Sequence, residues 1–119
     1  MDHLWQFCNL LGKDSLQAIS ACTKIIDRGD PKDRLIALNQ RGRAYVYRGW
    51  NDHALADFNE VLRINPKFVD GYNNRAVAYR QLGRFQEALA DHDRALAREK
   101  RPAFIQAREN TVKKMEAAR

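Results

Sequence analysis

Three histidines and two cysteines are the residues of this chain best suited to metal binding or nucleophilic catalysis. His3, His53 and His92 lie far apart in the sequence, and Cys8 and Cys22 are fourteen positions apart. A zinc site needs four such ligands, mostly in closely spaced pairs, and a nucleophilic cysteine needs a histidine oriented beside it. The sequence therefore predicts neither a metal site nor cysteine-based catalysis.

The triplet Asp91-His92-Asp93 contains a base between two acids, but its spacing does not suit catalysis. Successive side chains on a helix point about 100° apart, so the three cannot meet at one atom. The chain also lacks a glycine-rich phosphate loop and a Gly-x-Ser-x-Gly motif. We therefore expect a protein that is not an enzyme, with no cofactor and no small-molecule substrate. His92 is expected to fill a position in the core.

The composition of the 119 residues favours one globular domain, because 45% are hydrophobic and 30% are charged. No run of about 18 apolar residues occurs, so we expect no insertion into a membrane. The net charge of +6, from 21 basic and 15 acidic residues, favours a partner with acidic groups. Both signs are interspersed along the chain, and no patch combines basic and aromatic residues, so nucleic acid ranks below protein as a partner.

An internal repeat organises the elements that must position these residues. Residues 39–63 align with residues 73–97 at a constant offset of 34, and ten of the 25 aligned positions are identical. Such a period is typical of stacked helical hairpins. The identical pairs are Asn39/Asn73, Arg41/Arg75, Ala44/Ala78, Tyr45/Tyr79, Gly49/Gly83, Ala54/Ala88, Leu55/Leu89, Ala56/Ala90, Asp57/Asp91 and Leu62/Leu96.

Each repeat has the pattern of two helices joined by a turn. In the first repeat, Leu38, Gly42 and Tyr45 recur three or four positions apart, which is the spacing of one helical face. Gly49 predicts the end of that helix, and Asn51 predicts the start of the next.

Two arginines fall on helix faces that pack inside the predicted hairpins. Arg41 and Arg75 each stand sixteen positions before an aspartate on the facing helix. An arginine inside a packed hairpin needs an acidic partner, so we expect the ion pairs Arg41–Asp57 and Arg75–Asp91. Binding of a ligand by these arginines is the alternative.

The two repeats resemble the pattern of the tetratricopeptide repeat family, in which large, small and aromatic residues recur at fixed places in 34 positions. The resemblance implies an all-α fold, namely a right-handed solenoid of stacked antiparallel helix hairpins. The second repeat departs from the pattern at its end, where Lys100 replaces the expected proline. At the positions of the pattern stand Leu38, Gly42, Tyr45, Ala54, Phe58, Val61 and Pro66 in the first repeat and Tyr72, Ala76, Tyr79, Ala88, His92 and Ala95 in the second. His92 replaces the aromatic residue that the pattern usually has there.

The resemblance describes the chain as a single domain, residues 1–119, with atypical ends. Residues 3–32 form a degenerate first hairpin, whose helices are expected over 3–11 and 15–28. Full repeats follow at 35–68 and 69–102, and a helix over 103–118 caps the last of them.

The resemblance also predicts a binding surface, because in this family the first helix of each repeat lines a concave groove. A peptide or partner protein is expected to lie there, with amides pairing to its main chain and arginine gripping a carboxylate. Arg43, Asn74 and Arg108 form a partial version of the family's carboxylate clamp, provided that the last helix continues the register. The predicted binding residues are Asn39, Gln40, Arg43, Tyr47, Asn73, Asn74, Val77, Arg80 and Arg108.

Cys8 and Cys22 fall on adjacent predicted helices and leave two alternatives open. Free buried thiols would suit the cytoplasm. A disulfide would join the two helices of the first hairpin and imply an oxidising compartment, and the chain resembles small bacterial tetratricopeptide proteins with such a cysteine-bearing first hairpin. The expected location is the cytoplasm if Met1 is the native start, and the periplasm or the exterior if a signal peptide has been removed.

The predicted function is a scaffold for protein–protein interaction that binds its partner in the groove. The alternative is a structural module that self-associates as a homodimer through the apolar side of the last helix.

Overall fold

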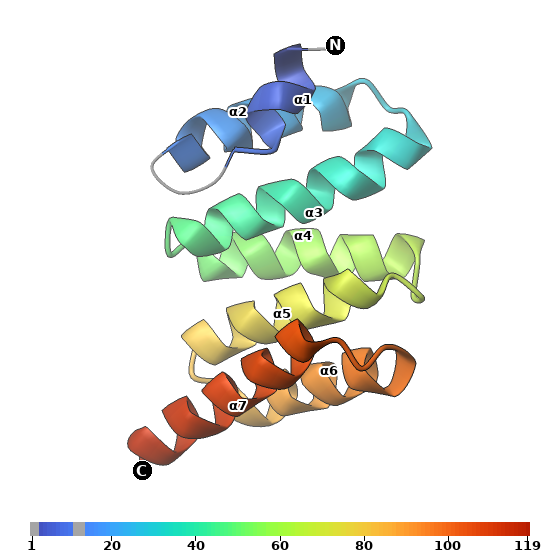
Figure 1. Cartoon of the computed structure of the whole chain (residues 1–119). Coiled ribbons are helices and arrows are strands. Elements are labelled where there is room, and N and C mark those ends of the chain that lie inside the picture. Colours follow the sequence, from blue (N-terminus) through green and yellow to red (C-terminus); the bar gives the residue numbers. More distant parts are fainter. Residues whose placement is uncertain (1–2, 11–13) are drawn as a thin grey trace.

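The chain folds as a stack of seven α-helices in a computed structural model that describes residues 3–10 and 14–119 (Figure 1). No strand occurs within those two ranges, and none of their helices is long and apolar enough to cross a membrane. The helices are α1 (His3–Cys8), α2 (Ser15–Asp27), α3 (Pro31–Tyr47), α4 (Asn51–Ile64), α5 (Val69–Gln81), α6 (Phe85–Arg98) and α7 (Pro102–Ala117).

The helices stack in chain order, and each packs mainly against its neighbours along the chain. In addition, α3 contacts α5, and α5 contacts α7, so the first helices of successive hairpins share one side of the stack. The resulting body is elongated, with extents of 44 × 28 × 23 Å. The predicted fold class, an all-α solenoid of helix hairpins, is confirmed.

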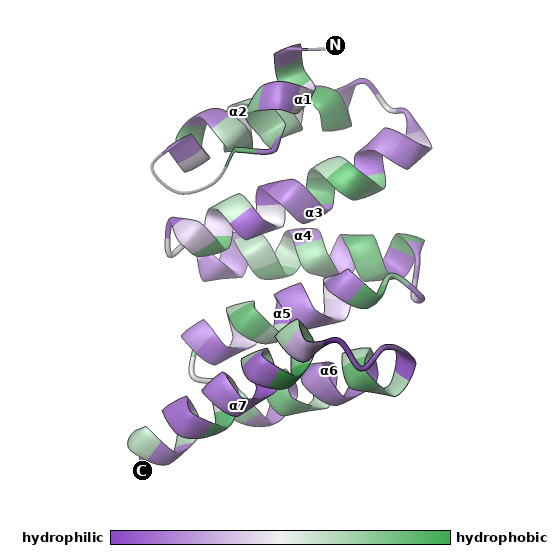
Figure 2. Ribbon diagram, in the orientation of Figure 1, coloured by the Kyte–Doolittle hydropathy of each residue, from purple (hydrophilic) through white to green (hydrophobic). Residues whose placement is uncertain are grey.

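Hydrophobic residues are spread through the helices rather than gathered in one segment (Figure 2). Every long helix alternates hydrophobic and hydrophilic residues along its length, which is the pattern of a helix with one buried side. The core is therefore a chain of contacts between adjacent helices, as a stack of repeats requires.

The turn after α3 ends that helix through Gly49, as the sequence predicts. The Gly49 N–H donates to the carbonyl of Val46 over 2.9 Å, and the Trp50 N–H donates to the carbonyl of Tyr45 over 2.8 Å. This pair of bonds satisfies carbonyls that the helix end would leave free, and it requires a positive φ, which is 78° at Gly49. The turn after α5 repeats the arrangement at Gly83, so the two hairpins share one geometry.

Close approach between α3 and α4 depends on Gly42, which faces the buried ring of Phe58. A Cβ atom on Gly42 would lie 2.5 Å from Cε1 of that ring, well inside van der Waals contact. The missing side chain is therefore what lets the ring of Phe58 fill the space between the two helices.

Ion pairs join the two helices of each full hairpin, as predicted. Arg41 donates from Nε and Nη2 to the two carboxylate oxygens of Asp57, each over 2.8 Å. Arg75 likewise donates from Nε and Nη2 to the two carboxylate oxygens of Asp91, over 2.7 and 2.8 Å. Both aspartates are buried, and the bidentate geometry compensates for their removal from water. The carboxylates in turn raise the pKa of Arg41 and of Arg75 above its ordinary value, chiefly through these hydrogen bonds.

The ends of the chain differ slightly from the predicted helices. The first helix, expected over 3–11, ends at Cys8, and residue 11 lies outside the described residues, as do residues 1–2 and 12–13. The last helix begins at Pro102, because proline is favoured in the first turn of a helix. The division into a single domain with a hairpin at 3–32, repeats at 35–68 and 69–102 and a cap at 103–118 stays a prediction.

Candidate functional site

The side of the stack that α3, α5 and the start of α7 share carries a polar hollow of about 450 Å³. Its lining is rich in side-chain amides and contains two arginines and one aspartate. The lining residues are Ile36, Asn39, Gln40, Arg43, Asp70, Asn73, Asn74, Arg101, Ala103 and Phe104.

An apolar hollow of about 260 Å³ adjoins the polar one and shares Arg43 and Asn74 with it. Its remaining lining is Val46, Tyr47, Phe58 and Val77. Tyr47 is 65% exposed, which is unusual for a residue with a large aromatic side chain. The two hollows together are called the groove below, and the groove runs from an amide-rich end to an aromatic and aliphatic end.

Arg43 is the exposed cation at the junction of the two hollows. Its Nη1 donates to Oε1 of Gln40 over 3.1 Å, and no acidic side chain pairs with it among the described residues. Its guanidinium therefore keeps donors that an incoming carboxylate could accept.

The amides of the groove are partly paired with one another. The side-chain nitrogen of Asn74 donates to Oδ1 of Asn39 over 2.9 Å and so ties α5 to α3. Oδ1 of Asn73 is buried and has no hydrogen-bond partner among the described residues. An unpaired buried acceptor is unfavourable, so a hydrogen bond donated to Asn73 by a ligand in the groove would be stabilising.

Seven of the nine predicted binding residues line the groove, and the helical spacing explains why. Residues three or four positions apart on α3 and on α5 lie on the same face, and that face is the one left open between the hairpins. The seven residues are Asn39, Gln40, Arg43, Tyr47, Asn73, Asn74 and Val77.

Arg80 and Arg108 are not among the residues that line the groove. Nη1 of Arg80 donates to the carbonyl of Ala107 and to Oγ1 of Thr111, so α7 covers it, and burial lowers its pKa. Nε of Arg108 donates to Oδ1 of Asp93 over 2.9 Å, which turns that side chain toward α6. The structure therefore does not bring Arg108 together with Arg43 and Asn74, because α7 directs Arg108 toward the neighbouring helix.

Arg101 lines the polar hollow although the sequence did not single it out as a binding residue. It lies in the connection between α6 and α7, and its Nη1 donates to Oδ1 of Asp70 over 2.7 Å. It also pairs with Glu99 and lies over the ring of Phe104, with its guanidinium carbon 4.7 Å from the ring centre. The only sequence signal was the dense basic stretch 98–101, which does not indicate a direction for any one side chain.

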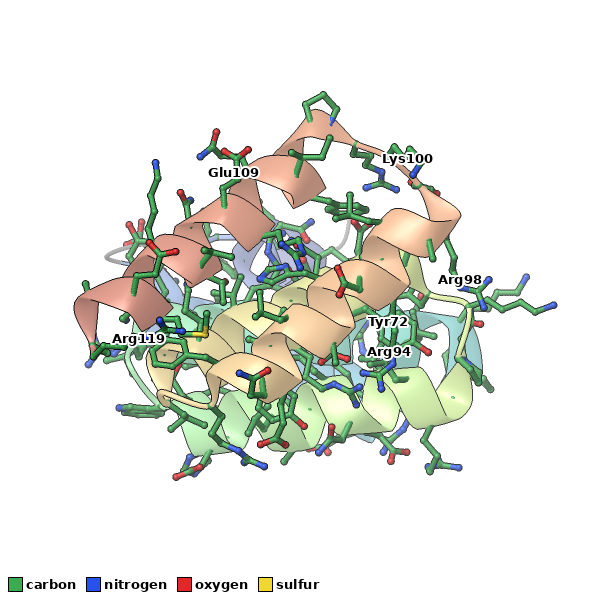
Figure 3. All side chains as sticks on the ribbon, turned by 90° about the horizontal axis from the view of Figure 1, so that it is seen from below. Tyr72, Arg94, Arg98, Lys100, Glu109 and Arg119 are labelled. Carbon is green, nitrogen blue, oxygen red and sulfur yellow. A yellow bond between two sulfur atoms is a disulfide. The ribbon has the colours of Figure 1, made fainter. Side chains whose placement is uncertain are left out.

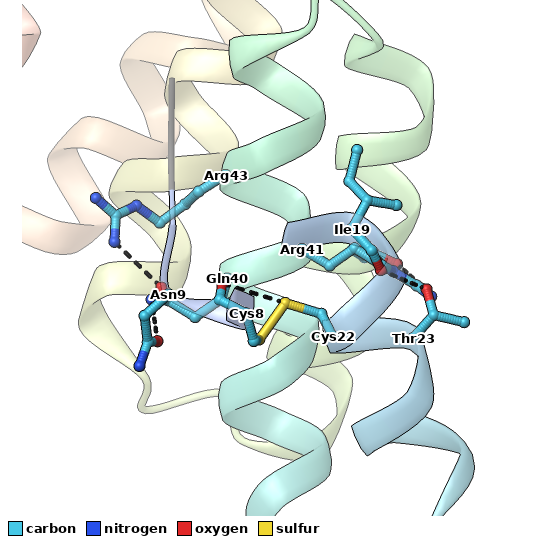
Figure 4. Close-up of a disulfide and its surroundings, with 9 residues drawn as sticks. Cys8, Asn9, Ile19, Cys22, Thr23, Gln40, Arg41 and Arg43 are labelled. Carbon is cyan, nitrogen blue, oxygen red and sulfur yellow. Dashed lines mark hydrogen bonds and ion pairs between the residues drawn. A yellow bond between two sulfur atoms is a disulfide. The ribbon is translucent and has the colours of Figure 1, made fainter. Parts of the chain in front are cut away.

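Cys8 and Cys22 are joined by a disulfide between α1 and α2, with Cα atoms 4.7 Å apart (Figure 4). Both residues are fully buried, so the bond lies inside the first hairpin and away from solvent. Among the described residues, no group of three His, Cys, Asp or Glu side chains is arranged to hold a metal ion.

His92 lies in the core between α6 and α7, as predicted, and not in the groove. Its Nε2 is 2.7 Å from Oγ1 of Thr111, and its Nδ1 has no partner among the described residues. Burial first, and then the charges of Arg80 and Arg108, lower the pKa of His92 to about 4. The ring is therefore neutral near pH 7 and serves to hold α7.

Comparison with known families agrees with this architecture. A family model described as TPR repeat matches residues 42–83, and one described as tetratricopeptide repeat matches residues 69–101. A solved structure described as the Arabidopsis OM64 TPR domain superposes with a TM-score of 0.77 over 85% of this chain and 83% of that one. The sequence identity in that comparison is 24%, so the likeness concerns the fold.

Two curated proteins with similar sequences are much longer than this chain. Sperm-associated antigen 1 of Rattus norvegicus is 42% identical over 60 residues, which are 50% of this chain and 7% of that protein. Heat shock protein STI1 of Saccharomyces cerevisiae is 32% identical over 84 residues, which are 71% of this chain and 14% of that protein. The chain thus corresponds to a small part of each of these relatives.

Proposed function

We propose that this chain, which belongs to the tetratricopeptide repeat family, is a non-catalytic scaffold that binds an extended segment of a partner protein in the groove. Stacked helical repeats offer an elongated surface of this kind, and protein–protein interaction is the activity that the fold supports. The partner and the residues that hold it are proposals from the geometry.

The observation that carries the proposal is the composition of the groove. Side-chain amides at one end have the donors and acceptors that a peptide main chain needs, and Asn73 offers a buried acceptor without a partner. The aromatic and aliphatic end, with Val46, Tyr47 and Val77, offers an apolar surface for a side chain of the same segment. An extended peptide presents both kinds of group along its length.

The charge of the groove favours a segment with acidic groups. Arg43 has no acidic partner among the described residues, and Asp70 is already paired with Arg101. A carboxylate beside Arg43 would therefore meet a cation whose donors are not used by another carboxylate. The proposed binding residues are Asn39, Gln40, Arg43, Tyr47, Asn73, Asn74, Val77 and Arg101.

Self-association through the outer side of α7 has less support. Ile105 is 45% exposed there, but it stands between charged and polar neighbours such as Gln106 and Glu109. Stable dimers bury roughly 800 Å² on each partner, which one isolated isoleucine does not provide.

Fluorescence anisotropy with a defined peptide panel tests the proposal. The panel consists of labelled acidic, neutral and basic heptapeptides that share one central leucine. We expect the acidic peptides to bind most tightly and Arg43→Glu to weaken that binding about tenfold or more, since it replaces a charge-assisted hydrogen bond with repulsion. Asn74→Ala should weaken binding to all three classes.

The matched control is Arg98→Glu, which makes the same change of charge outside the groove. Arg98 is exposed and projects outward from α6 in Figure 3. We expect it to change affinity by about twofold at most, because salt screens distant charges. Binding that Arg43→Glu and Arg98→Glu weaken equally would contradict a groove site, as would a panel in which no peptide binds.

A further inference from the structure

The first helix, α1, is too short to be stable without support from the rest of the chain. It has 6 residues, whereas isolated helices below about 12 residues are marginal in water. Trp5 and Phe7 pack against the buried cluster that contains Ile25 and Leu38, and the disulfide from Cys8 supplies the covalent attachment to α2.

A chain of side-chain contacts leads from α1 to the groove (Figure 4). Asn9 directly follows Cys8, and its backbone N–H donates to the carbonyl of Trp5, so it moves with the end of α1. Oδ1 of Asn9 accepts a hydrogen bond from Nε2 of Gln40 over 2.8 Å. Gln40 thereby presents its Oε1 to Arg43, which donates to it over 3.1 Å.

This chain of contacts constrains an arginine that would otherwise rotate freely. Exposed arginine side chains lose rotamer entropy when a ligand immobilises them. Gln40 restricts Arg43 before a ligand arrives, and Asn9 fixes the orientation of the amide of Gln40. A preorganised cation binds a carboxylate more tightly than a mobile one.

The second helix, α2, has attachments to α3 that do not involve the disulfide. Nη1 of Arg41 donates to Oγ1 of Thr23 over 3.1 Å, and Ile25 and Ile26 are buried in the core beside α3. Loss of the disulfide therefore removes the covalent support of α1 while these attachments of α2 remain. The consequence is confined to α1 and to Asn9, which directly follows it.

We propose that the Cys8–Cys22 disulfide controls the affinity of the groove for acidic segments, with Asn9 as the positioning residue that acts on Arg43 through Gln40. The proposal rests on the proposed function, because it assigns a control to the same groove. The oxidised protein holds Arg43 oriented and binds tightly. The reduced protein leaves α1 loosely attached and binds more weakly.

The redox step is an ordinary thiol–disulfide exchange with a dithiol. One reductant thiolate attacks a sulfur of the disulfide and releases the other cysteine as a thiolate, and the second reductant thiolate then attacks the mixed disulfide and releases the remaining cysteine. The reductant loses two electrons and two protons and closes into a cyclic disulfide, while Cys8 and Cys22 gain them as two thiols. Because both cysteines are buried, the attack follows local opening of α1.

Peptide affinity at two redox states tests the proposal. The probe is the labelled acidic heptapeptide with a central leucine, measured by anisotropy with the oxidised protein and with protein reduced by dithiothreitol. We expect reduction to weaken binding by about threefold to tenfold, as the loss of one or two modest orienting hydrogen bonds implies. The double variant with Cys8→Ser and Cys22→Ser should match the reduced protein.

Two further variants separate positioning from general loosening of the hairpin. Asn9→Ala keeps the disulfide but removes the acceptor for Gln40, so its affinity should equal that of the reduced protein in both redox states. Gln6→Ala changes an exposed residue of α1 and should keep the full redox dependence. An affinity that does not change on reduction overturns the proposal. A redox dependence that persists unchanged in Asn9→Ala overturns the role of Asn9.

A second readout keeps this test separate from the test of the proposed function. The Nε–H signal of Arg43 in NMR spectra reports the surroundings of its guanidinium without any ligand. We expect that signal to shift on reduction of the wild-type protein and to stay unchanged on reduction of Asn9→Ala. If the peptide fails to bind but the signal shifts in this way, the proposed function is wrong and the coupling stands. If the signal does not shift on reduction, the coupling is wrong.

Discussion

The two ends of the helix stack are held by different kinds of contact. At the N-terminal end, a disulfide and a cluster of apolar side chains attach α1 to α2 and α3. At the C-terminal end, α7 rests on a buried polar group, in which His92 meets Thr111 and Arg80 donates to the hydroxyl of Thr111. Phe104 adds the buried apolar contact at the start of that helix.

The difference implies that each end responds to its own chemical condition. A covalent bond between sulfur atoms is sensitive to reductants and indifferent to moderate acid. A neutral buried imidazole is sensitive to acid and indifferent to reductants. Between the ends, both full hairpins contain the same kind of ion pair, Arg41–Asp57 in one and Arg75–Asp91 in the other. The chain therefore departs from its own repeat at its two ends.

The largest effect should come from removing the disulfide. We expect the double variant with Cys8→Ala and Cys22→Ala to lose roughly 3 kcal/mol in the free energy of unfolding, the value typical of a closed loop of about 15 residues. Urea unfolding measures the loss, and hydrogen exchange should locate it chiefly in α1. Faster exchange in α7 of the same variant would show that the two ends are coupled rather than independent.

Acid should weaken the other end by a similar amount. The pKa of His92 is lowered from 6.5 to about 4. Below pH 6.5 this histidine therefore binds a proton in the unfolded chain but stays neutral in the folded one. Stability is thus complete above pH 6.5 and declines progressively toward pH 4, by up to about 3 kcal/mol. Urea unfolding across this range measures the decline. The charges of Arg80, Arg108, Asp91 and Asp93 act on the same ring.

Substitution of His92 tests the origin of that decline. His92→Gln keeps a hydrogen-bonding group toward Thr111 and removes the titration, so its unfolding free energy should vary less with pH between 6.5 and 4. His53→Gln is the matched control, because His53 is exposed. An equal decline in the wild-type protein and in His92→Gln would assign the acid sensitivity to other groups.

A smaller effect should follow from removing a hydroxyl at either end. Thr111→Val removes the hydroxyl that contacts both His92 and Arg80 and leaves Arg80 with the carbonyl of Ala107, and we expect it to destabilise the protein by about 2 kcal/mol. Thr23→Val makes the same change beside Arg41, which keeps its bidentate grip on Asp57. We expect about 1 kcal/mol or less there. Thermal unfolding of the pair measures the difference, and equal losses would contradict a special role for the hydroxyl under α7.

The smallest effect on stability should come from Arg108→Ala. Its pair with Asp93 is solvent-exposed, so we expect a change within about 0.5 kcal/mol. The same substitution removes a cation near the imidazole and should raise the pKa of His92, which an NMR titration of the ring protons measures. Lys113→Ala, on the exposed side of α7, is the control. A pKa of His92 that does not respond to Arg108→Ala would show that the charge of Arg108 does not contribute to it.

Features with a short reach along the sequence could be predicted from the residues. Gly49 and Gly83 end their helices because the turn needs a positive φ, which glycine adopts without strain. The Arg41–Asp57 and Arg75–Asp91 pairs follow from a fixed separation within one hairpin. The groove residues on α3 and α5 were expected from the resemblance to the repeat family, and helical spacing places them on one face of each helix.

Features that depend on how a connection is directed could not be predicted. Arg101 reaches the groove and Arg108 does not, because the path of residues 99–101 sets where α7 begins and which way its faces turn. Arg108 was predicted to be a binding residue because the repeat register was extended into α7. That extension ignores the missing proline at Lys100, after which the register of the repeat no longer applies.

The sequence by itself determined the repeat, its helices and its inner ion pairs, because each depends on periodicity or on a separation of a few turns. Its resemblance to the repeat family predicted most of the residues that line the groove. Only the tertiary structure decided that Cys8 meets Cys22, that His92 meets Thr111 and that Asn9 reaches Gln40. Those contacts join separate helices whose relative placement is set by the packing of all the helices between and beside them. Distances of that kind are a property of the folded stack and are absent from the local pattern of the chain.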